Sequence, residues 1–194
     1  MASGRTWNVL MVGVGGQGIV TSSDILVRAA MEAGHDAKKS EIHGMSQRGG
    51  SVFSHIRFGP SVSSPVIPEG GADVLFSLEE LETLRWLQYA HAGTTVICAT
   101  AEITPVGMER YPPGVPEAVR EACPNLVLVD VAKLEERIGN PRYLNVAILG
   151  VLAGLLDIDD ASWRAAIDAE VPPAHAEGNW SAFQAARELA RSLV

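Results

Sequence analysis

Residues 7–30, WNVLMVGVGGQGIVTSSDILVRAA, pass from an apolar run through a glycine-rich turn into a helical pattern. We predict a strand over Asn8–Val12, because the run is short, apolar and followed by glycine. We predict a helix from about Gly18 to Gly34, because apolar residues recur there at helical spacing and Gly34 can end the helix. A strand, a glycine turn and a helix in this order are typical of α/β domains.

The turn contains Gly13, Gly15 and Gly18 in the spacing G-x-G-x-x-G, with Gly16 and Gln17 between them. Glycines allow a tight turn and let backbone N–H groups approach an anion, while the start of the helix adds partial positive charge. The same pattern also occurs where a strand-to-helix turn simply needs glycine. The turn therefore predicts a dinucleotide site, a site for another anion, or a purely structural turn.

A dinucleotide site also requires an acidic residue about 20 positions further on, at the end of the second strand. Asp36 lies at the start of that predicted strand, and Glu41 is better placed but runs into an unusual turn. Gln17 within the loop is also unusual for a dinucleotide fingerprint. The loop alone thus gives a dinucleotide only weak support.

The remaining pattern alternates strands with helices and predicts a three-layer, Rossmann-like α/β fold. We expect strands over 36–42, 51–59, 72–78, 94–100 and 126–130, and helices over 79–90, 145–158, 159–171 and 179–193, with Asp159 or Asp160 as a cap. The link between 36–42 and 51–59 is too short for a crossover helix, so these strands run antiparallel or lie apart. We expect a central, mixed sheet, a Pro-rich excursion over 102–118, a helical C-terminal portion and a single domain over 1–194.

A second glycine segment, SEIHGMSQRGGSVFSHIRFG, covers residues 40–59. It places three polar residues, Ser46, Gln47 and Arg48, directly before Gly49 and Gly50. We expect this segment to form one polar wall with the first glycine loop. Arg48 either clamps a phosphate or carboxylate through two hydrogen bonds or forms a structural salt bridge, and the sequence favours neither.

Catalytic and metal-binding patterns are scarce in the chain. His43 and His55 are 12 positions apart without a third ligand at metal spacing, so we expect hydrogen-bonded structural histidines and no metal site. No Ser-His-Asp set, no paired catalytic carboxylates and no H-E-x-x-H motif stand out. The only cysteines, Cys98 and Cys123, cannot supply the four thiolates of an iron–sulfur cluster.

Composition excludes further classes of protein. The 194 residues are 47% hydrophobic and 20% charged, as in ordinary globular proteins. The net charge of −8 argues against nucleic-acid binding, and no apolar run is long enough to span a membrane. We expect a cytoplasmic, reduced protein without a signal peptide.

The two glycine segments together, GVGGQGI…DILVRAA and SEIHGMSQRGGSVFSHIRFG, resemble the gamma domain of 2-oxoacid:ferredoxin oxidoreductases. The form EIHGMSQRGGSV is most similar to the small beta subunit of the indolepyruvate:ferredoxin oxidoreductases. The resemblance continues through ADVLFSLEELETLR, Pro105, NVAILGVLAGL and EGNWSAF, and spans essentially the whole chain. One departure is Ala186, where the family commonly has glycine.

The resemblance implies a non-catalytic subunit that is inactive alone and a partner chain that carries thiamine diphosphate, magnesium and iron–sulfur clusters. The complex would convert a 2-oxoacid, such as indolepyruvate or another arylpyruvate, and coenzyme A to an acyl-CoA while reducing ferredoxin. By this resemblance, two groups of residues would face the partner or the phosphates of the coenzyme. The first is Gly13, Gly15, Gly16, Gln17 and Gly18, and the second is Ser46, Gln47, Arg48, Gly49 and Gly50. We expect the isolated chain to form a homodimer. The alternative is a stand-alone nucleotide-binding module that uses the glycine loop.

Overall fold

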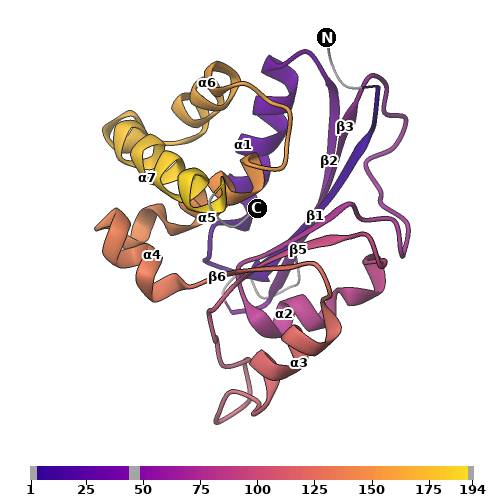
Figure 1. Cartoon of the computed structure of the whole chain (residues 1–194), viewed down its shortest axis with the longest axis vertical. Helices are drawn as coiled ribbons and strands as arrows, with labels where there is room; N and C mark the ends of the chain where they lie inside the picture. The colour runs from indigo at the N-terminus through magenta and orange to yellow at the C-terminus, as the bar shows by residue number, and fades with distance from the viewer. Residues whose placement is uncertain (1–3, 44–48, 192–194) are drawn as a thin grey trace.

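A computed structural model of the chain describes residues 4–43 and 49–191. Its centre is a six-stranded sheet in the order β2-β3-β1-β4-β5-β6 (Figure 1). The strands are β1 (Trp7–Val14), β2 (Asp36–His43), β3 (Ser51–Gly59), β4 (Val74–Ser77), β5 (Thr95–Ala99) and β6 (Leu126–Val129).

The sheet is mixed because one strand runs against the others. β3 pairs antiparallel with both β2 and β1, whereas β1, β4, β5 and β6 pair in parallel. The predicted mixed sheet is confirmed, and of the two alternatives for the strands 36–42 and 51–59 the structure shows the antiparallel one. The reason is the short link between them, which leaves no room for a crossover.

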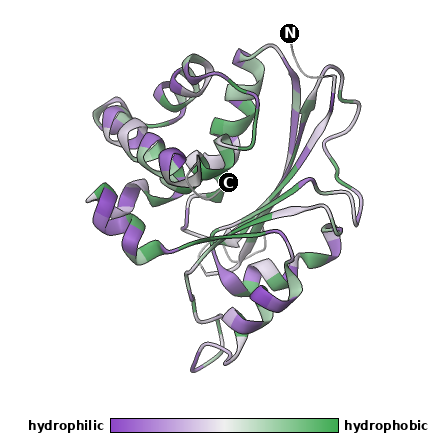
Figure 2. Cartoon of the chain, viewed as in Figure 1, coloured by the Kyte–Doolittle hydropathy of each residue, from purple (hydrophilic) through white to green (hydrophobic). Residues whose placement is uncertain are grey.

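Helices cover both faces of the sheet and make the three predicted layers (Figure 1). One layer contains α1 (Ile19–Glu32), α4 (Val131–Ile138), α5 (Leu144–Ala153), α6 (Asp160–Glu170) and α7 (Pro173–Arg191). The other contains α2 (Glu80–Arg85), the 3₁₀ turn η1 (Leu87–Tyr89) and α3 (Val115–Ala122). A short 3₁₀ turn, η2 (Pro141–Tyr143), precedes α5. Alternate residues of the strands point to opposite faces of the sheet and contribute to two apolar cores, one beneath each layer of helices. Figure 2 shows the apolar strands lying between the two layers of helices.

The C-terminal helices pack closely against one another, as the predicted helical portion requires. A methyl group added to Gly150 of α5 would lie 2.1 Å from the carbonyl oxygen of Phe183 in α7, so glycine sets this close approach. Asp159 caps α6 by accepting a hydrogen bond from the backbone N–H of Ser162 at 2.9 Å. α1 ends just before Gly34, whose φ is 85°, as expected.

Several helix predictions were incomplete. The helix expected over 79–90 is divided into α2 and η1, and α7 begins at Pro173 instead of near 179. The Pro-rich excursion contains α3, in which a proline occupies the first turn, where it has no hydrogen bond to break. α4 was not predicted, since it has only eight residues and a largely polar surface.

Candidate functional site

The glycine loop follows β1 at the edge of the sheet where the parallel strands end. β1 leads into α1 on one face, and the neighbouring β4 leads into α2 on the opposite face. Where adjacent strands send their helices to opposite faces, the ends of the strands are left uncovered and a ligand can enter. The topology therefore places the loop at the usual binding position of an open α/β sheet.

Gln17 holds the loop in shape. Its side-chain Oε1 accepts a hydrogen bond from the backbone N–H of Val14 at 2.7 Å, and its Nε2 donates to the carbonyl oxygen of Leu78 at 2.6 Å. Leu78 follows β4, so this one side chain joins the ends of the two strands. The amide is thus engaged with the chain's own backbone.

The loop needs glycine for two different reasons. Gly16 and Gly18 have φ values of 104° and 85°, in the left-handed region. A methyl group on Gly18 would lie 2.5 Å from the side-chain amide nitrogen of Asn145, whereas a methyl group on Gly16 would meet nothing within 4 Å. Gly13 is restricted by space, because its added methyl group would lie 2.9 Å from both Gln17 Oε1 and Ile19.

The two glycine segments meet through their backbones. Gly15 N–H donates to the carbonyl oxygen of Gly50 at 2.8 Å, and Gly49 N–H donates to the carbonyl oxygen of Gly15 at 3.3 Å. Gly49 has a φ of 76°. The predicted side chains of this wall, Ser46, Gln47 and Arg48, lie outside the described residues.

The start of α1 is electropositive. Gly18 provides no side-chain cap, and the first turn contains no acidic residue. The first N–H groups of a helix have no partner within the helix, and they carry the positive end of its dipole. This helix end can therefore accept an anion.

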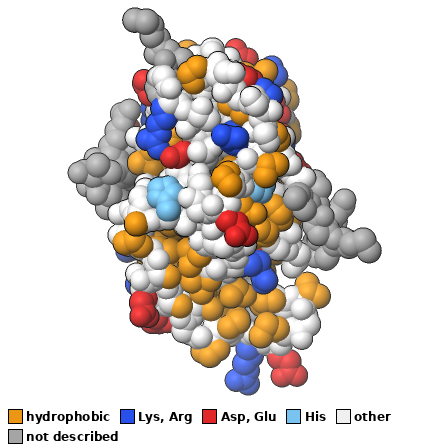
Figure 3. All heavy atoms as spheres, turned by 90° about the vertical axis from the view of Figure 1, so that its right-hand side faces the viewer, with side chains coloured by type: hydrophobic (Ala, Val, Ile, Leu, Met, Phe, Trp, Pro, Cys, Tyr) orange, Lys and Arg blue, Asp and Glu red, His pale blue; other side chains and the backbone are white. Residues whose placement is uncertain are grey.

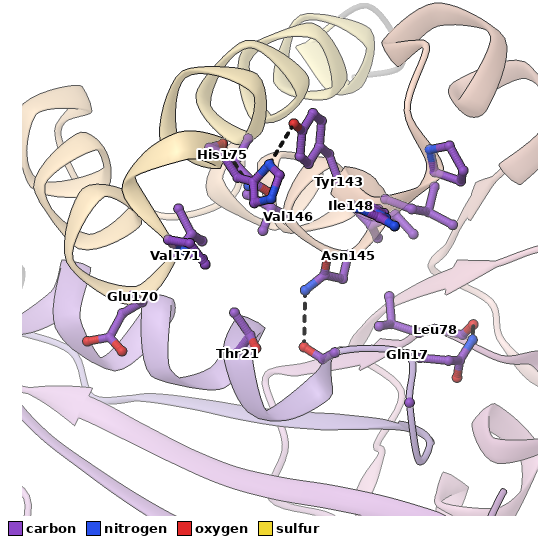
Figure 4. A pocket seen from close by; sticks show the side chains of 17 residues that line it. Gln17, Thr21, Leu78, Tyr143, Asn145, Val146, Ile148, Glu170, Val171 and His175 are labelled. Atoms are coloured by element: carbon purple, nitrogen blue, oxygen red, sulfur yellow. Dashed lines mark hydrogen bonds between the residues drawn. The ribbon is translucent and has the colours of Figure 1, made fainter. Parts of the chain in front are cut away.

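A cavity of about 490 Å³ opens beside this helix end (Figure 4). Its walls come from the glycine loop, the start of α1, Leu78, and the C-terminal helices. The side chains from those helices include Arg142, Tyr143, Asn145, Glu170, His175 and Asn179. A second hollow of about 350 Å³, lined by Val14, Gly15, Gly16, Gly18, Ile19, Val20 and Val52, lies at the same loop.

Sequence patterns did not predict the polar side chains of the cavity. Asn145 donates to the carbonyl oxygen of Gly18 at 3.2 Å and to Ser22 Oγ at 3.3 Å, so α5 is tied to the start of α1. Tyr143 and His175 hydrogen bond to each other at 3.3 Å across the cavity wall (Figure 4). One signal was present: Asn145 is a lone polar residue at the start of an otherwise apolar helix.

A buried carboxylate anchors the Pro-rich excursion next to the loop. Glu79 caps α2 by accepting from Glu82 N–H at 2.7 Å, and its other oxygen accepts from Tyr111 Oη at 2.7 Å and from Ile103 N–H at 3.3 Å. Burial raises the pKa of Glu79, against the lowering effect of these hydrogen bonds. Burial also raises the pKa of Tyr111, and the neighbouring Glu79 adds to that effect.

Other candidate groups are structural. His55 is buried, and its Nδ1 accepts from Ile67 N–H at 3.2 Å, so it is the hydrogen-bonded structural histidine that was predicted. Its pKa is lowered by burial. The side chain of His43 is not described. Cys98 is fully buried, as expected, and burial raises the pKa of its thiol to about 12.

The described part of the chain contains neither a cluster of metal ligands nor a membrane-spanning helix. Within 4–43 and 49–191, no three His, Cys, Asp or Glu side chains gather where they could hold a metal ion. Among the helices of the same residues, none combines the length and the apolarity needed to cross a bilayer.

Comparison with known proteins identifies the relatives of the chain. Residues 8–189 match the family described as pyruvate ferredoxin/flavodoxin oxidoreductase. An indolepyruvate oxidoreductase subunit IorB from Archaeoglobus fulgidus is 42% identical over 76% of both chains. The IorB subunit of Thermococcus kodakarensis is 34% identical over 98% of both chains.

Solved structures show the same fold. The gamma subunit of a keto/oxoacid ferredoxin oxidoreductase from Geobacter sulfurreducens superposes with a TM-score of 0.69 at 22% identity, covering 96% of this chain and 99% of that one. The pyruvate oxidoreductase subunit PORC of Thermotoga maritima gives a TM-score of 0.70 at 20% identity, covering 95% and 96%. The relatives do not support the stand-alone nucleotide-binding alternative. The chain belongs to the pyruvate ferredoxin/flavodoxin oxidoreductase family, as the small subunit of an oxidoreductase complex.

Proposed function

We propose that the chain assembles with a large partner that binds thiamine diphosphate, magnesium and iron–sulfur clusters, and that the complex oxidises an arylpyruvate such as indolepyruvate to an acyl-CoA. Ferredoxin accepts the electrons. The observation that carries this proposal is the identity of 34–42% to indolepyruvate oxidoreductase subunits over most of their length. A 2-oxoglutarate:ferredoxin oxidoreductase from Magnetococcus marinus, solved with coenzyme A bound, has a similar fold at 17% identity, with a TM-score of 0.73 over 99% of this chain and 32% of that one.

We further propose that the glycine loop accepts a phosphate of coenzyme A. The open N–H groups at the start of α1 and the adjoining 490 Å³ cavity support this role. Three of the predicted contact residues, Gly16, Gln17 and Gly18, line the cavity. Gln17 also holds the loop in shape through its two hydrogen bonds. Arg48 stays a predicted phosphate ligand, and Arg48→Ala should weaken coenzyme A-dependent turnover.

The isolated chain should be colourless and should not reduce a viologen dye with any 2-oxoacid. Co-expression with the large partner should restore reduction that depends on both the 2-oxoacid and coenzyme A. Turnover by the purified chain alone would contradict the proposal. So would a co-purified complex, loaded with thiamine diphosphate and clusters, that is inactive with every arylpyruvate.

A pair of glycine variants tests the coenzyme site within the complex. Gly16→Leu adds a side chain beside the cavity, and we expect the KM for coenzyme A to rise about tenfold, equivalent to about 1.4 kcal/mol. Gly34→Leu is the matched control, because Gly34 also has a positive φ, 85°, and open space for a side chain, but lies at the other end of α1. Equal KM values in the two variants would refute the site.

Hydrophobic side chains are exposed at the surface, as expected of a subunit that binds a partner in a complex. On the face drawn in Figure 3, hydrophobic side chains gather in the lower half. The rings of Phe53 and Trp86 contact each other at an angle of 43°, with centroids 4.0 Å apart, and both side chains are only partly buried. Val106 and Met108 are exposed. Exposed apolar surface of this kind marks interaction sites. We therefore propose that the chain folds as one domain and docks to the large partner through exposed apolar surface. Separately, we propose that the isolated chain forms a two-fold dimer, the commonest closed symmetry.

A further inference from the structure

We propose that β2 is the surface through which two copies of this chain pair, antiparallel and centred on Ser40, so that their sheets become continuous. This inference rests on the proposed self-association and gives it a location. β2 is the terminal strand of the sheet, and β3 pairs with it along its whole length, Asp36 to His43. In the described chain no strand pairs with its other edge.

The free edge of β2 is suited to pairing. Every second residue of an edge strand directs its N–H and C=O groups away from the sheet, where another strand can bind them. Proteins block such edges with bulges, prolines or inward charges. β2 contains no proline, and its unbroken register with β3 contains no bulge.

The two lysines of β2 do not block the edge as isolated charges. The Nζ atom of Lys39 lies 2.5 Å from a carboxylate oxygen of Asp24 in α1 and 2.7 Å from a carboxylate oxygen of Glu41. Lys38 lies 2.8 Å from a carboxylate oxygen of Asp36 on the same strand. The chain therefore compensates both positive charges before any partner arrives.

Symmetry and charge select the register. A two-fold axis perpendicular to the sheet keeps each face on its own side, so one residue must lie opposite itself. When that residue is Ser40, each Lys39 lies opposite Glu41 of the second copy on the α1 side, and this pair occurs twice. When it is Lys38, Lys39 or Glu41, like charges face each other, which is destabilising in cross-strand pairs. When it is Ala37, Asp36 lies opposite Lys38, but only residues 36–38 of β2 are aligned, against residues 37–43 in the Ser40 register.

Cysteine cross-linking of the isolated full chain tests this register. In the Ser40→Cys variant the two cysteines lie directly opposite, with Cα atoms about 4.5–5.5 Å apart, within the range of a disulfide. In the matched control Ala37→Cys they lie six residues apart along the strand, roughly 20 Å. Mild oxidation should link Ser40→Cys at least tenfold faster than Ala37→Cys on a non-reducing gel. The native Cys98 and Cys123 are buried and do not interfere.

Light scattering distinguishes the possible failures. A wild-type chain that is monomeric at high concentration would refute both the self-association and the β2 interface, without touching the oxidoreductase role. A wild-type dimer with equal cross-linking of the two variants would refute the β2 interface alone. Ser40→Lys, which places two lysines opposite each other, should weaken the dimer at least tenfold, while its melting temperature equals that of the wild type when both are diluted to monomers. A dimer of unaltered affinity in that variant would also overturn the inference.

Discussion

The stability of the glycine loop should depend on a single side chain, Gln17. In Gln17→Ala, the buried Val14 N–H loses its acceptor and the buried Leu78 carbonyl loses its donor. A buried donor left without a partner costs about 1–3 kcal/mol, and the second hydrogen bond contributes about 0.5–1.5 kcal/mol. We expect the free energy of unfolding to fall by about 2–4 kcal/mol, and the melting temperature of a chain this size by roughly 5–15 °C.

The assay is urea unfolding of the isolated chain, followed by circular dichroism, with the exposed Gln184→Ala in α7 as control. Ordinary surface substitutions change the free energy of unfolding by less than about 0.5 kcal/mol. A decrease this small for Gln17→Ala would refute the stabilising role of the Gln17 hydrogen bonds. Gln17→Glu sharpens the test. Its carboxylate faces the Leu78 carbonyl at neutral pH, whereas a protonated carboxyl can donate to that oxygen, so its stability should approach that of the wild type as the pH falls.

Two other changes should act through packing and through burial of charge. Gly150→Ala should lower the free energy of unfolding by about 1–3 kcal/mol because the new methyl group would collide with the Phe183 carbonyl, although alanine is the better helix former by about 1 kcal/mol. Thermal melting of Gly150→Ala beside the exposed Ala165→Gly would show this, and a gain in stability would contradict it. Glu79 has a raised pKa in the folded state, so the protein should lose stability relative to Glu79→Gln as the pH rises from the ordinary value of 4.5 through the raised pKa. Unfolding curves at several pH values would measure the difference in free energy of unfolding between the wild type and Glu79→Gln. A difference that does not change with pH would contradict the raised pKa of Glu79.

The sequence predicted the central elements because their signals are local. The apolar run, the glycine turn and the helical spacing after Gly18 lie within 24 residues, and the structure places β1 and α1 there. The mixed sheet followed from a connection too short for a crossover. The position of β3 between β2 and β1 could not be read in the same way, since strand order depends on pairing between distant segments.

The site was harder to predict because its contacts are distant in sequence. Gln17 looked unusual for a dinucleotide loop, but its partner Leu78 lies 61 positions away, and nothing local links the two. Asn145 reaches the loop across 127 positions. The cavity walls come from helices whose packing against α1 is set by the whole core, so residue patterns indicated the loop but not its surroundings.

The place of β3 also decides from which direction a ligand can approach the loop. In a dinucleotide-binding sheet, the second strand lies beside the first and its terminal acid reaches the ribose. Here β3 lies between β2 and β1, so the end of β2 is two strand spacings from β1, about 10 Å. The Gly15 N–H already donates a hydrogen bond to the Gly50 carbonyl oxygen. The chain's own backbone thus takes the place where an adenosine ribose would lie. The 490 Å³ cavity lies on the side of α5 and α7 instead, so the proposed coenzyme phosphate would reach the start of α1 past Asn145.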